Sequence, residues 1–291
     1  PRVSTNGVHK QDEAPEWAAA PPVGDEPVGK QPAKTPDDAP VIDVLKYRAE
    51  DGGILDAWVE HYASRWTYAT GADKWYYWQG IYWQLDDRLL LLKELRELLD
   101  TLNQQCRDII KETPGRIENI VGKFKNGVIP DSINKQIESM QTGTEIAEAM
   151  RKATKRTNGR IGSVEGMARS INALPISSFD SNESINLANG TLNLHSLELG
   201  SHDRTDLFTY QLDYDYDPNA RCPLFEKFIA EVLVKEGTEE TDPDLVKLFQ
   251  ELLGYSLTTK TEREVMVWMF GDGGNGKSVV ISIIEALLGP M

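Results

Sequence analysis

Apolar residues recur every three to four positions in several stretches of the chain, which is the spacing of an α-helix with one buried face. Asp86 or Asp87 can cap the first of these helices, and the Pro114–Gly115 pair is expected to end it. A second helix is predicted from Thr142, because Thr142 and Glu145 match a capping box. The apolar positions of the two helices are Leu91, Leu95, Leu98, Leu102 and Ile109, then Ile146, Ala149, Met150 and Ala153.

Two further amphipathic helices are predicted nearer the carboxyl end. Pro223 suits the first position of one helix. Thr241, Asp242 and Pro243 mark the start of the other, and Gly254 is expected to end it. Their apolar stripes consist of Phe225, Phe228, Ile229, Val232 and Leu233, and of Leu245, Leu248, Phe249, Leu252 and Leu253. Each stripe needs a partner surface that buries it.

Alternation of apolar and polar residues predicts strands in other stretches. Residues 74–83 match two short strands about a Gln79–Gly80 turn, and residues 185–194 match a hairpin about Asn189–Gly190. Residues 210–217 alternate aromatic or aliphatic residues with aspartates, which indicates a strand with one acidic, solvent-facing side. The aspartates Asp213, Asp215 and Asp217 also resemble the opening of a calcium loop, although Pro218 stands where such a loop needs glycine.

The first strands belong to a cluster of aromatic residues with two possible roles. The aromatic side chains could stack on nucleic-acid bases. The favoured interpretation is a small core under a sheet, because short strands need bulky residues to bury any surface. The cluster consists of Trp58, Trp66, Tyr68, Trp75, Tyr76, Tyr77, Trp78, Tyr82 and Trp83.

Composition narrows the class of protein. The chain has 291 residues, 40% of them apolar, and a formal net charge of −15, which argues against a surface that is basic throughout. Arg151, Lys152, Lys155 and Arg156 form a local exception, either a phosphate-contacting helix face or a solvated one. The two cysteines lack metal-ligand spacing, and no apolar run could span a membrane. We therefore expect a protein of the bacterial or host cytoplasm without a membrane partner.

Residues 1–42 are rich in proline, alanine and acidic residues, which predicts a disordered linker. The chain begins with Pro1 and not with Met, so we expect it to be part of a longer protein. We divide the remainder into an α+β domain over residues 43–220 and a second region over residues 221–291 that opens with the two carboxyl-terminal helices.

That second region holds the strongest chemical signal. The apolar run 265–270 is typical of a strand buried in a parallel sheet, and the sequence Gly271-Asp-Gly-Gly-Asn-Gly-Lys-Ser278 follows it directly. A helical stripe comes next, with Val280, Ile283, Ile284, Leu287 and Leu288. Strand, GxxxxGK[ST] and helix together are the phosphate-binding loop in its required context.

The residue types explain the spacing. Glycines let the backbone curve inward so that N–H groups converge on phosphate oxygens at a helix amino terminus. Lys277 is expected to reach the β- and γ-phosphates of ATP as the catalytic cation, and Ser278 to bind Mg²⁺. The predicted cofactor-binding residues are Gly271, Asp272, Gly273, Gly274, Asn275, Gly276, Lys277, Ser278 and Val279.

Residues 248–278 resemble the start of the helicase domain of phage, plasmid and poxvirus-type primase-helicases of superfamily 3. Residues 75–83, Leu187-Ala-Asn-Gly-Thr-Leu-Asn-Leu and Cys222-Pro-Leu-Phe-Glu-Lys-Phe are similar to the domain that precedes the ATPase in that family. The resemblance implies an α/β fold, with a mixed α+β accessory domain followed by the first βα unit of a P-loop ATPase of the AAA+ type.

By similarity, the parent protein is an ATP-driven, hexameric helicase for DNA replication of a mobile element. Its ring acts on a single strand or fork of DNA, and a primase domain lies upstream. The family's later acidic, sensor and arginine-finger residues have no counterpart before Met291. Two alternatives stay open: an oligomerisation or binding module over residues 43–220 that links a primase to the ring, and a small-molecule or nucleotide kinase with the same loop.

Overall fold

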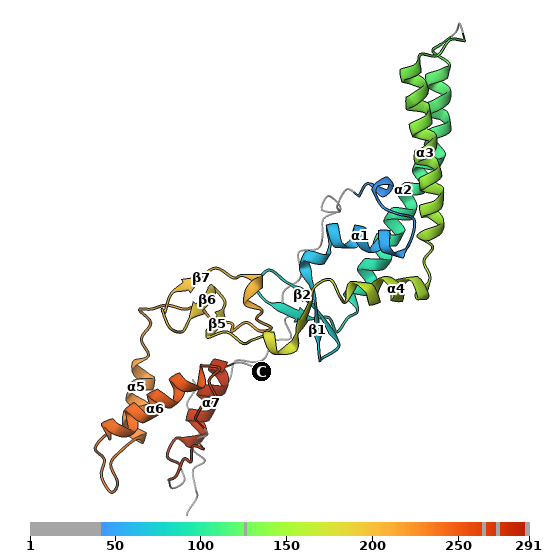
Figure 1. Ribbon diagram of the computed structural model, residues 1–291. Coiled ribbons are helices and arrows are strands. Elements are labelled where there is room, and N and C mark those ends of the chain that lie inside the picture. Colours follow the sequence, from blue (N-terminus) through green and yellow to red (C-terminus); the bar gives the residue numbers. More distant parts are fainter. Residues whose placement is uncertain (1–41, 125–126, 264–265, 272–273, 289–291) are drawn as a thin grey trace, which may run out of the picture. The chain divides into compact units, whose positions relative to one another are not determined.

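The computed structural model describes residues 42–124, 127–263, 266–271 and 274–288 (Figure 1). These belong to the unit that spans residues 40–291. The linker predicted over residues 1–42 lies outside the described residues except for its last position. The fold is mixed α/β, as predicted, with a four-stranded and a three-stranded sheet in the described part. Short 3-10 helices are formed by Val44–Lys46, Ala63–Arg65, Ile176–Ser178 and Arg204–Asp206.

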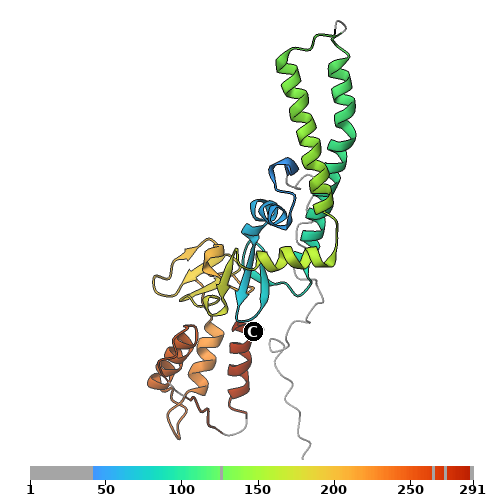
Figure 2. The same cartoon turned by 45° about the vertical axis from the view of Figure 1, so that its right-hand side comes forward.

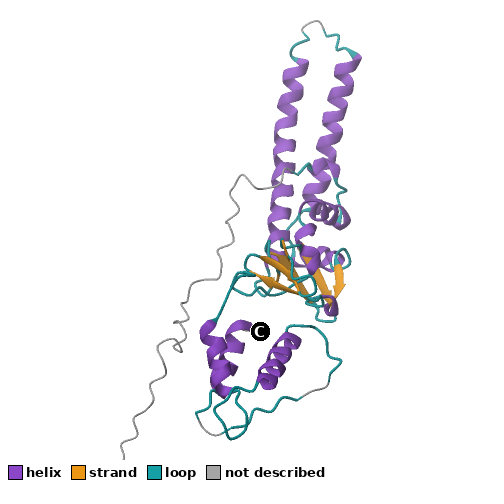
Figure 3. Ribbon diagram, turned by 90° about the vertical axis from the view of Figure 1, so that its left-hand side faces the viewer, coloured by secondary structure: helices purple, strands orange, loops and turns teal. Residues whose placement is uncertain are grey.

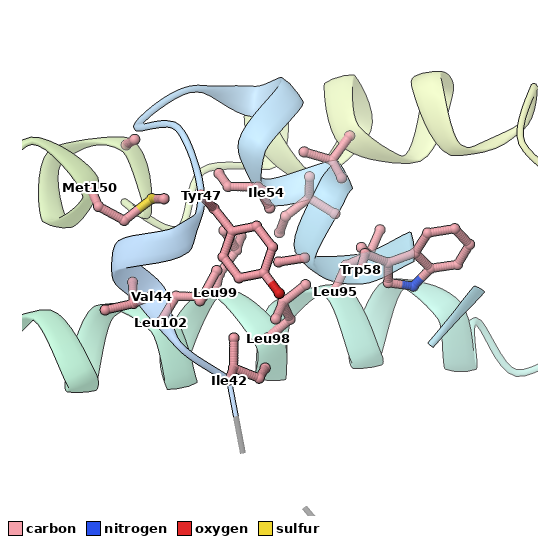
Figure 4. Close-up of a cluster of buried hydrophobic side chains, with 14 of the residues drawn as sticks. Ile42, Val44, Tyr47, Ile54, Trp58, Leu95, Leu98, Leu99, Leu102 and Met150 are labelled. Atoms are coloured by element: carbon pink, nitrogen blue, oxygen red, sulfur yellow. The ribbon is translucent and has the colours of Figure 1, made fainter. Parts of the chain in front are cut away.

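The main core lies among α1 (Asp51–His61), α2 (Leu90–Val121), α3 (Asp131–Ala153) and α4 (Asn158–Ala168). Figure 4 shows side chains of α1 against the leucines of α2, with Met150 of α3 nearby. Burial of each leucine contributes about 1.5–3 kcal/mol. The predicted stripe of the first helix is confirmed for its first four leucines, which are almost completely buried: Leu91, Leu95, Leu98 and Leu102.

Asp86 satisfies the first N–H groups of α2 as predicted, although Leu89 occupies the N-cap position, and the predicted end of the helix is wrong. Asp86 accepts hydrogen bonds from the backbone N–H groups of Leu90 and Leu91 at 2.8 and 3.1 Å. The helix then continues through Pro114 to Val121. Proline removes one helical hydrogen bond, but α3 packs along α2 (Figure 2) and supplies contacts that an isolated helix would lack.

The predicted capping box of the second helix is wrong. α3 begins at Asp131, directly after Pro130, so Thr142 and Glu145 lie in its interior. The apolar residues Ile133, Ile137 and Met140 extend the stripe toward the amino terminus with the same period. Ala147 takes the buried position that was expected of Ala149, which is exposed.

The aromatic strands form a sheet with the order β3-β2-β1-β4. The predicted pair is confirmed as β2 (Lys74–Trp78) and β3 (Trp83–Leu85), and Gly80 in the turn has a φ of 98°. β1 (Trp66–Thr70) and β4 (Ala173–Pro175) were not predicted. They pair in parallel although about 100 residues separate them, so no local pattern could reveal the pairing.

The second predicted hairpin is confirmed as β5 (Ser184–Leu187) and β6 (Gly190–Asn193), joined by residues 188–189, with β7 (Leu199–Gly200) beside β6. The predicted strand over residues 210–217 is wrong. It makes a single bridge, from Leu212 to Leu187. The amide side chain of Asn189 bonds both backbone groups of Tyr216, at 2.9 and 3.0 Å, and so takes the place of a strand partner.

The carboxyl-terminal region contains helices joined by loops in its described parts (Figure 3). α5 (Pro223–Val232) and α6 (Pro243–Ser256) confirm the two predicted amphipathic helices. Asp242 caps α6 through the N–H groups of Asp244 and Leu245. Gly254 does not end α6, which runs to Ser256. α7 (Lys277–Leu288) confirms the helix predicted after the glycine-rich loop.

The strand predicted over residues 265–270 is wrong for the part that the structure describes. Residues 266–270 have no regular secondary structure, and the side chains of Met266, Trp268 and Phe270 are 68–84% exposed. A strand that is buried on both faces needs neighbouring strands, and none of the described strands pairs with this segment. Residues 266–270 of the apolar run therefore lie open to solvent.

No helix among the described residues is long and apolar enough to cross a membrane.

Candidate functional site

Three glycines of the predicted phosphate-binding loop have backbone conformations that L side chains rarely adopt. Gly271, Gly274 and Gly276 have φ angles of 148°, 83° and 80°, in the region that favours glycine. Asp272 and Gly273 lie outside the described residues. The chain thus turns where the sequence supplies glycine, which is the requirement for a backbone that curves around an anion.

Gly276 is also fixed by packing. A Cβ atom at this position would lie 2.9 Å from the ring of Phe228 and 3.0 Å from Val232, both on α5. A larger residue would therefore need both a strained φ and a displaced α5. Phe228 and Val232 were predicted as members of an apolar stripe, but nothing in the pattern indicated that the stripe supports the loop.

Lys277 brings the two ends of the loop together. Its Nζ donates hydrogen bonds to the carbonyl oxygen of Gly271 at 2.9 Å and to Oδ1 of Asn275 at 2.5 Å. Lys277 is also the first residue of α7. The ammonium group and the positive end of the helix therefore act on the same small region.

The first turn of α7 supplies further donors. The backbone N–H of Val280 bonds to the carbonyl of Gly276 at 3.0 Å. The N–H groups of Ser278 and Val279 belong to the first turn, where an α-helix supplies no internal acceptor. Ser278 is exposed and Val279 is half-buried. Backbone N–H groups, one ammonium and one hydroxyl fit a phosphate chain, and a single hydroxyl suits Mg²⁺, which usually keeps several waters. The assignment of these residues to ATP and Mg²⁺ stays a prediction.

The far end of α7 has a contact that sequence reasoning missed. The hydroxyl of Tyr214 donates to the carbonyl of Leu287 at 2.9 Å, and burial raises the pKa of Tyr214. This bond satisfies a carbonyl of the last helical turn. Tyr214 was interpreted only as the apolar side of a strand, and its neighbouring aspartates suggested calcium. Among the described residues, no group of three or more His, Cys, Asp or Glu is placed to hold a metal ion.

The four cations of residues 151–156 do not share one helix face, so that prediction is wrong. α3 ends at Ala153, which leaves Lys155 and Arg156 in the connection to α4. All four cations are exposed. Arg156 pairs with Asp100 at 3.0 Å. The stretch is therefore a basic corner between two helices, still free of acidic residues in its sequence.

The aromatic cluster is a core, which confirms the favoured interpretation. Trp58, Trp66 and Trp83 are at most 5% exposed. The indole N–H groups of Trp58 and Trp66 donate to Oε1 of Glu94 at 3.1 and 2.9 Å. Arg65 forms an ion pair with the same carboxylate, and burial lowers the pKa of Arg65. The glutamate therefore satisfies the polar groups of two buried rings. The remaining rings at residues 75–78 are half-buried and pack against the buried clusters.

A second polar cluster joins α4 to the aromatic sheet. Arg169 bonds Glu165 and Asp73, each at 2.9 Å. The hydroxyl of Tyr68 donates to Asp73, and this bond, helped by Arg169, lowers the pKa of Asp73. Trp75 donates to Glu165 at 2.8 Å. Each charged group has a protein partner, so the role of the cluster is to hold α4 against the aromatic sheet.

Comparison with models of known families assigns most of the α+β region. A family model described as D5 N terminal like matches residues 56–234. The matched region begins within α1, contains both sheets and ends just after α5. The glycine-rich loop lies beyond it. No curated protein matches the chain.

Proposed function

Because the chain belongs to the D5 N-terminal-like family, which is associated with primase-helicase proteins in DNA replication, we propose that it serves an ATP-driven replicative DNA helicase of a phage, prophage or plasmid. The observation that carries this proposal is the glycine-rich loop. Gly271, Gly274 and Gly276 adopt conformations that favour glycine, and Lys277 stands at the start of α7.

Binding of ATP requires a change of partners at Lys277. Its Nζ, which bonds Gly271 and Asn275, exchanges these oxygens for oxygens of the β- and γ-phosphates. The N–H groups from Gly274 to Val279 then face the phosphate chain. Ser278 offers its hydroxyl to Mg²⁺, which neutralises charge on the phosphates when it is bound. The packing of Gly276 against Phe228 keeps the loop seated on α5 during this exchange.

In this proposal, copies of the protein assemble into a homohexameric ring, with a primase domain upstream in the parent chain. DNA, as a single strand or a fork, passes through the ring. A central channel reconciles DNA binding with a net charge of −15, because only the channel needs to be basic.

Substitution of Lys277 by alanine in the complete gene product tests nucleotide use. We expect DNA-stimulated ATP hydrolysis to fall at least about 100-fold, since one donor to the developing charge is lost. Lys247→Ala on α6 is the matched control, because Lys247 is an exposed lysine whose only described ion pair is with Glu251 at 3.9 Å. Equal rates for wild type and Lys277→Ala would overturn the proposal.

The basic corner offers a test of DNA contact outside the loop. Lys152→Glu combined with Lys155→Glu should weaken binding of single-stranded DNA and reduce the slope of log affinity against log salt by about 0.7 per lost contact. The control is Lys227→Glu on α5, an exposed lysine. Identical salt slopes in the wild type and the double variant would show that the corner does not contact DNA.

A kinase with the same loop is the competing function. It would transfer phosphate to a small acceptor without any effect of DNA. Measurement of ATP hydrolysis with and without DNA, together with a screen for phosphorylated nucleosides, separates the two functions. The family match to residues 56–234 favours the helicase.

A further inference from the structure

A groove runs between α2 and α3 in the half of the helical hairpin that lies beyond Cys106. It has a volume of about 500 Å³, and all of its lining residues come from these two helices. Its apolar surface comes mainly from Pro114, Ile117 and Val121 of α2. Val121 is 41% exposed. The groove therefore presents apolar surface that the described part of the chain leaves uncovered.

The groove is negatively charged. Glu118, Glu145 and Glu148 line it, and its lining contains no lysine, arginine or histidine. Arg116, the nearest cation along α2, pairs with Glu112 at 2.6 Å. Carboxylates beside apolar surface in one groove attract a ligand that is both basic and apolar.

These features decide against other occupants. A polyanion such as DNA would be repelled by the three carboxylates. A second copy that docks by two-fold symmetry would place the same carboxylates opposite one another. An extended peptide has no free strand edge to pair with, because both walls are helices whose backbone groups bond internally.

We propose that this groove binds an amphipathic helix of another protein, with apolar residues at positions i, i+4 and i+7 and lysine or arginine beside them. The occupant lies along α2 and α3 as a third helix. The stretch from Thr113 to Val121 rises about 12 Å along the helix axis, which corresponds to between two and three turns of the partner. So short an interface predicts a dissociation constant in the micromolar range.

The first measurement uses three fluorescein-labelled peptides of about 14 residues and the complete chain. The probe has leucines at helical spacing flanked by lysines. One control peptide keeps the lysines but replaces the leucines by serine, and the other keeps the leucines but replaces the lysines by glutamate. We expect fluorescence anisotropy to show micromolar binding of the probe and at least about tenfold weaker binding of both controls.

Charge reversal then locates the site. Glu145→Lys combined with Glu148→Lys should weaken binding of the probe at least about tenfold, whereas Glu138→Lys, on an exposed position of α3 outside the groove, should leave it unchanged. Circular dichroism checks that each variant keeps its helices. Hydrogen exchange provides a second readout, with slower exchange at residues 113–121 and 141–148 when the probe is bound.

Three results would overturn the proposal. The probe could fail to bind, it could bind the Glu145→Lys/Glu148→Lys variant as tightly as the wild type, or the serine control could bind equally well. Light scattering adds a fourth: if these substitutions dissociate a dimer of the chain, a second copy occupies the groove. None of these measurements depends on ATP, so the proposal can fail independently of the helicase assignment.

Discussion

The two halves of the α2–α3 hairpin are built from the same repeating pattern and differ in what surrounds them. In the near half, α1, α4 and the segment around Val44 cover the pair, and Leu98 and Leu102 are completely buried. In the far half, the described part of the chain places no third element beside the two helices (Figure 2), and Ile117 and Val121 keep contact with solvent. The difference shows that a helical stripe predicts a helix and does not predict the number of neighbours that the helix finds.

In the far half, a binding partner can therefore supply the covering contacts that α1, α4 and the segment around Val44 supply in the near half. This comparison can be tested by substitutions that should have large effects in the near half and small or opposite effects in the far half.

The largest effect is expected from Glu94→Ala. The substitution leaves two indole N–H groups and the charge of Arg65 without their shared acceptor, which should lower the free energy of unfolding by about 3–5 kcal/mol. Glu97→Ala, one turn along α2 and exposed, should change it by less than about 0.5 kcal/mol. Urea denaturation measures both. Similar values for the two variants would mean that the buried carboxylate does not organise the core.

A direct comparison of the halves comes from Leu98→Ala and Ile117→Ala. The buried leucine should cost about 2–5 kcal/mol on truncation, because a cavity remains. The half-exposed isoleucine should cost about 1 kcal/mol or less, because less surface returns to water. The same urea titrations apply. A larger loss at Ile117 would show that the far half is already covered in solution.

Pro114→Ala should act in the opposite direction. Alanine restores the backbone hydrogen bond that proline removes and relieves the clash with the preceding turn, so the free energy of unfolding should rise by about 1–2 kcal/mol. Gly115→Ala tests helix propensity alone at an open position and should give no more than about 1 kcal/mol. A loss of stability in Pro114→Ala would indicate that the proline shapes the hairpin.

The smallest effect concerns pH. Burial raises the pKa of the Cys106 thiol from 9.0 to about 11. The folded protein holds this proton more tightly than the unfolded chain, so the contribution is complete below pH 9 and is lost as pH rises toward 11. Melting temperatures of wild type and Cys106→Ala should converge across this interval.

At pH 8, iodoacetamide should label the exposed Cys222 and spare Cys106, and equal labelling would show that the near half opens.

Local chemistry explains which elements the sequence predicted. The turn at Gly80, the hairpin at residues 184–193 and the start of α6 at Asp242 each depend on a few adjacent residues, and the structure confirms them. The parallel pairing of β1 with β4 depends on distant residues and was missed.

The candidate site likewise has features that the sequence predicted and features that only the structure revealed. Glycine spacing predicted where the backbone of the loop turns, at Gly271, Gly274 and Gly276. The support that α5 gives through Phe228 and the bond from Tyr214 to α7 came only from the fold. The prediction of a strand before the loop is wrong for residues 266–270. The composition of this segment favours a strand, but none of the described strands lies beside it to form a sheet.

The length of α2 has a consequence for any protein that docks on it. A helix of 32 residues extends about 48 Å, and the groove opens about 35 Å from its first residue. The stiff hairpin would hold a bound partner at a nearly constant distance from the main core. The effective concentration of the partner would therefore be high at that distance from the core and negligible at other distances. Shortening the hairpin by two whole turns on each helix would then reduce that distance while every contact in the groove stayed the same.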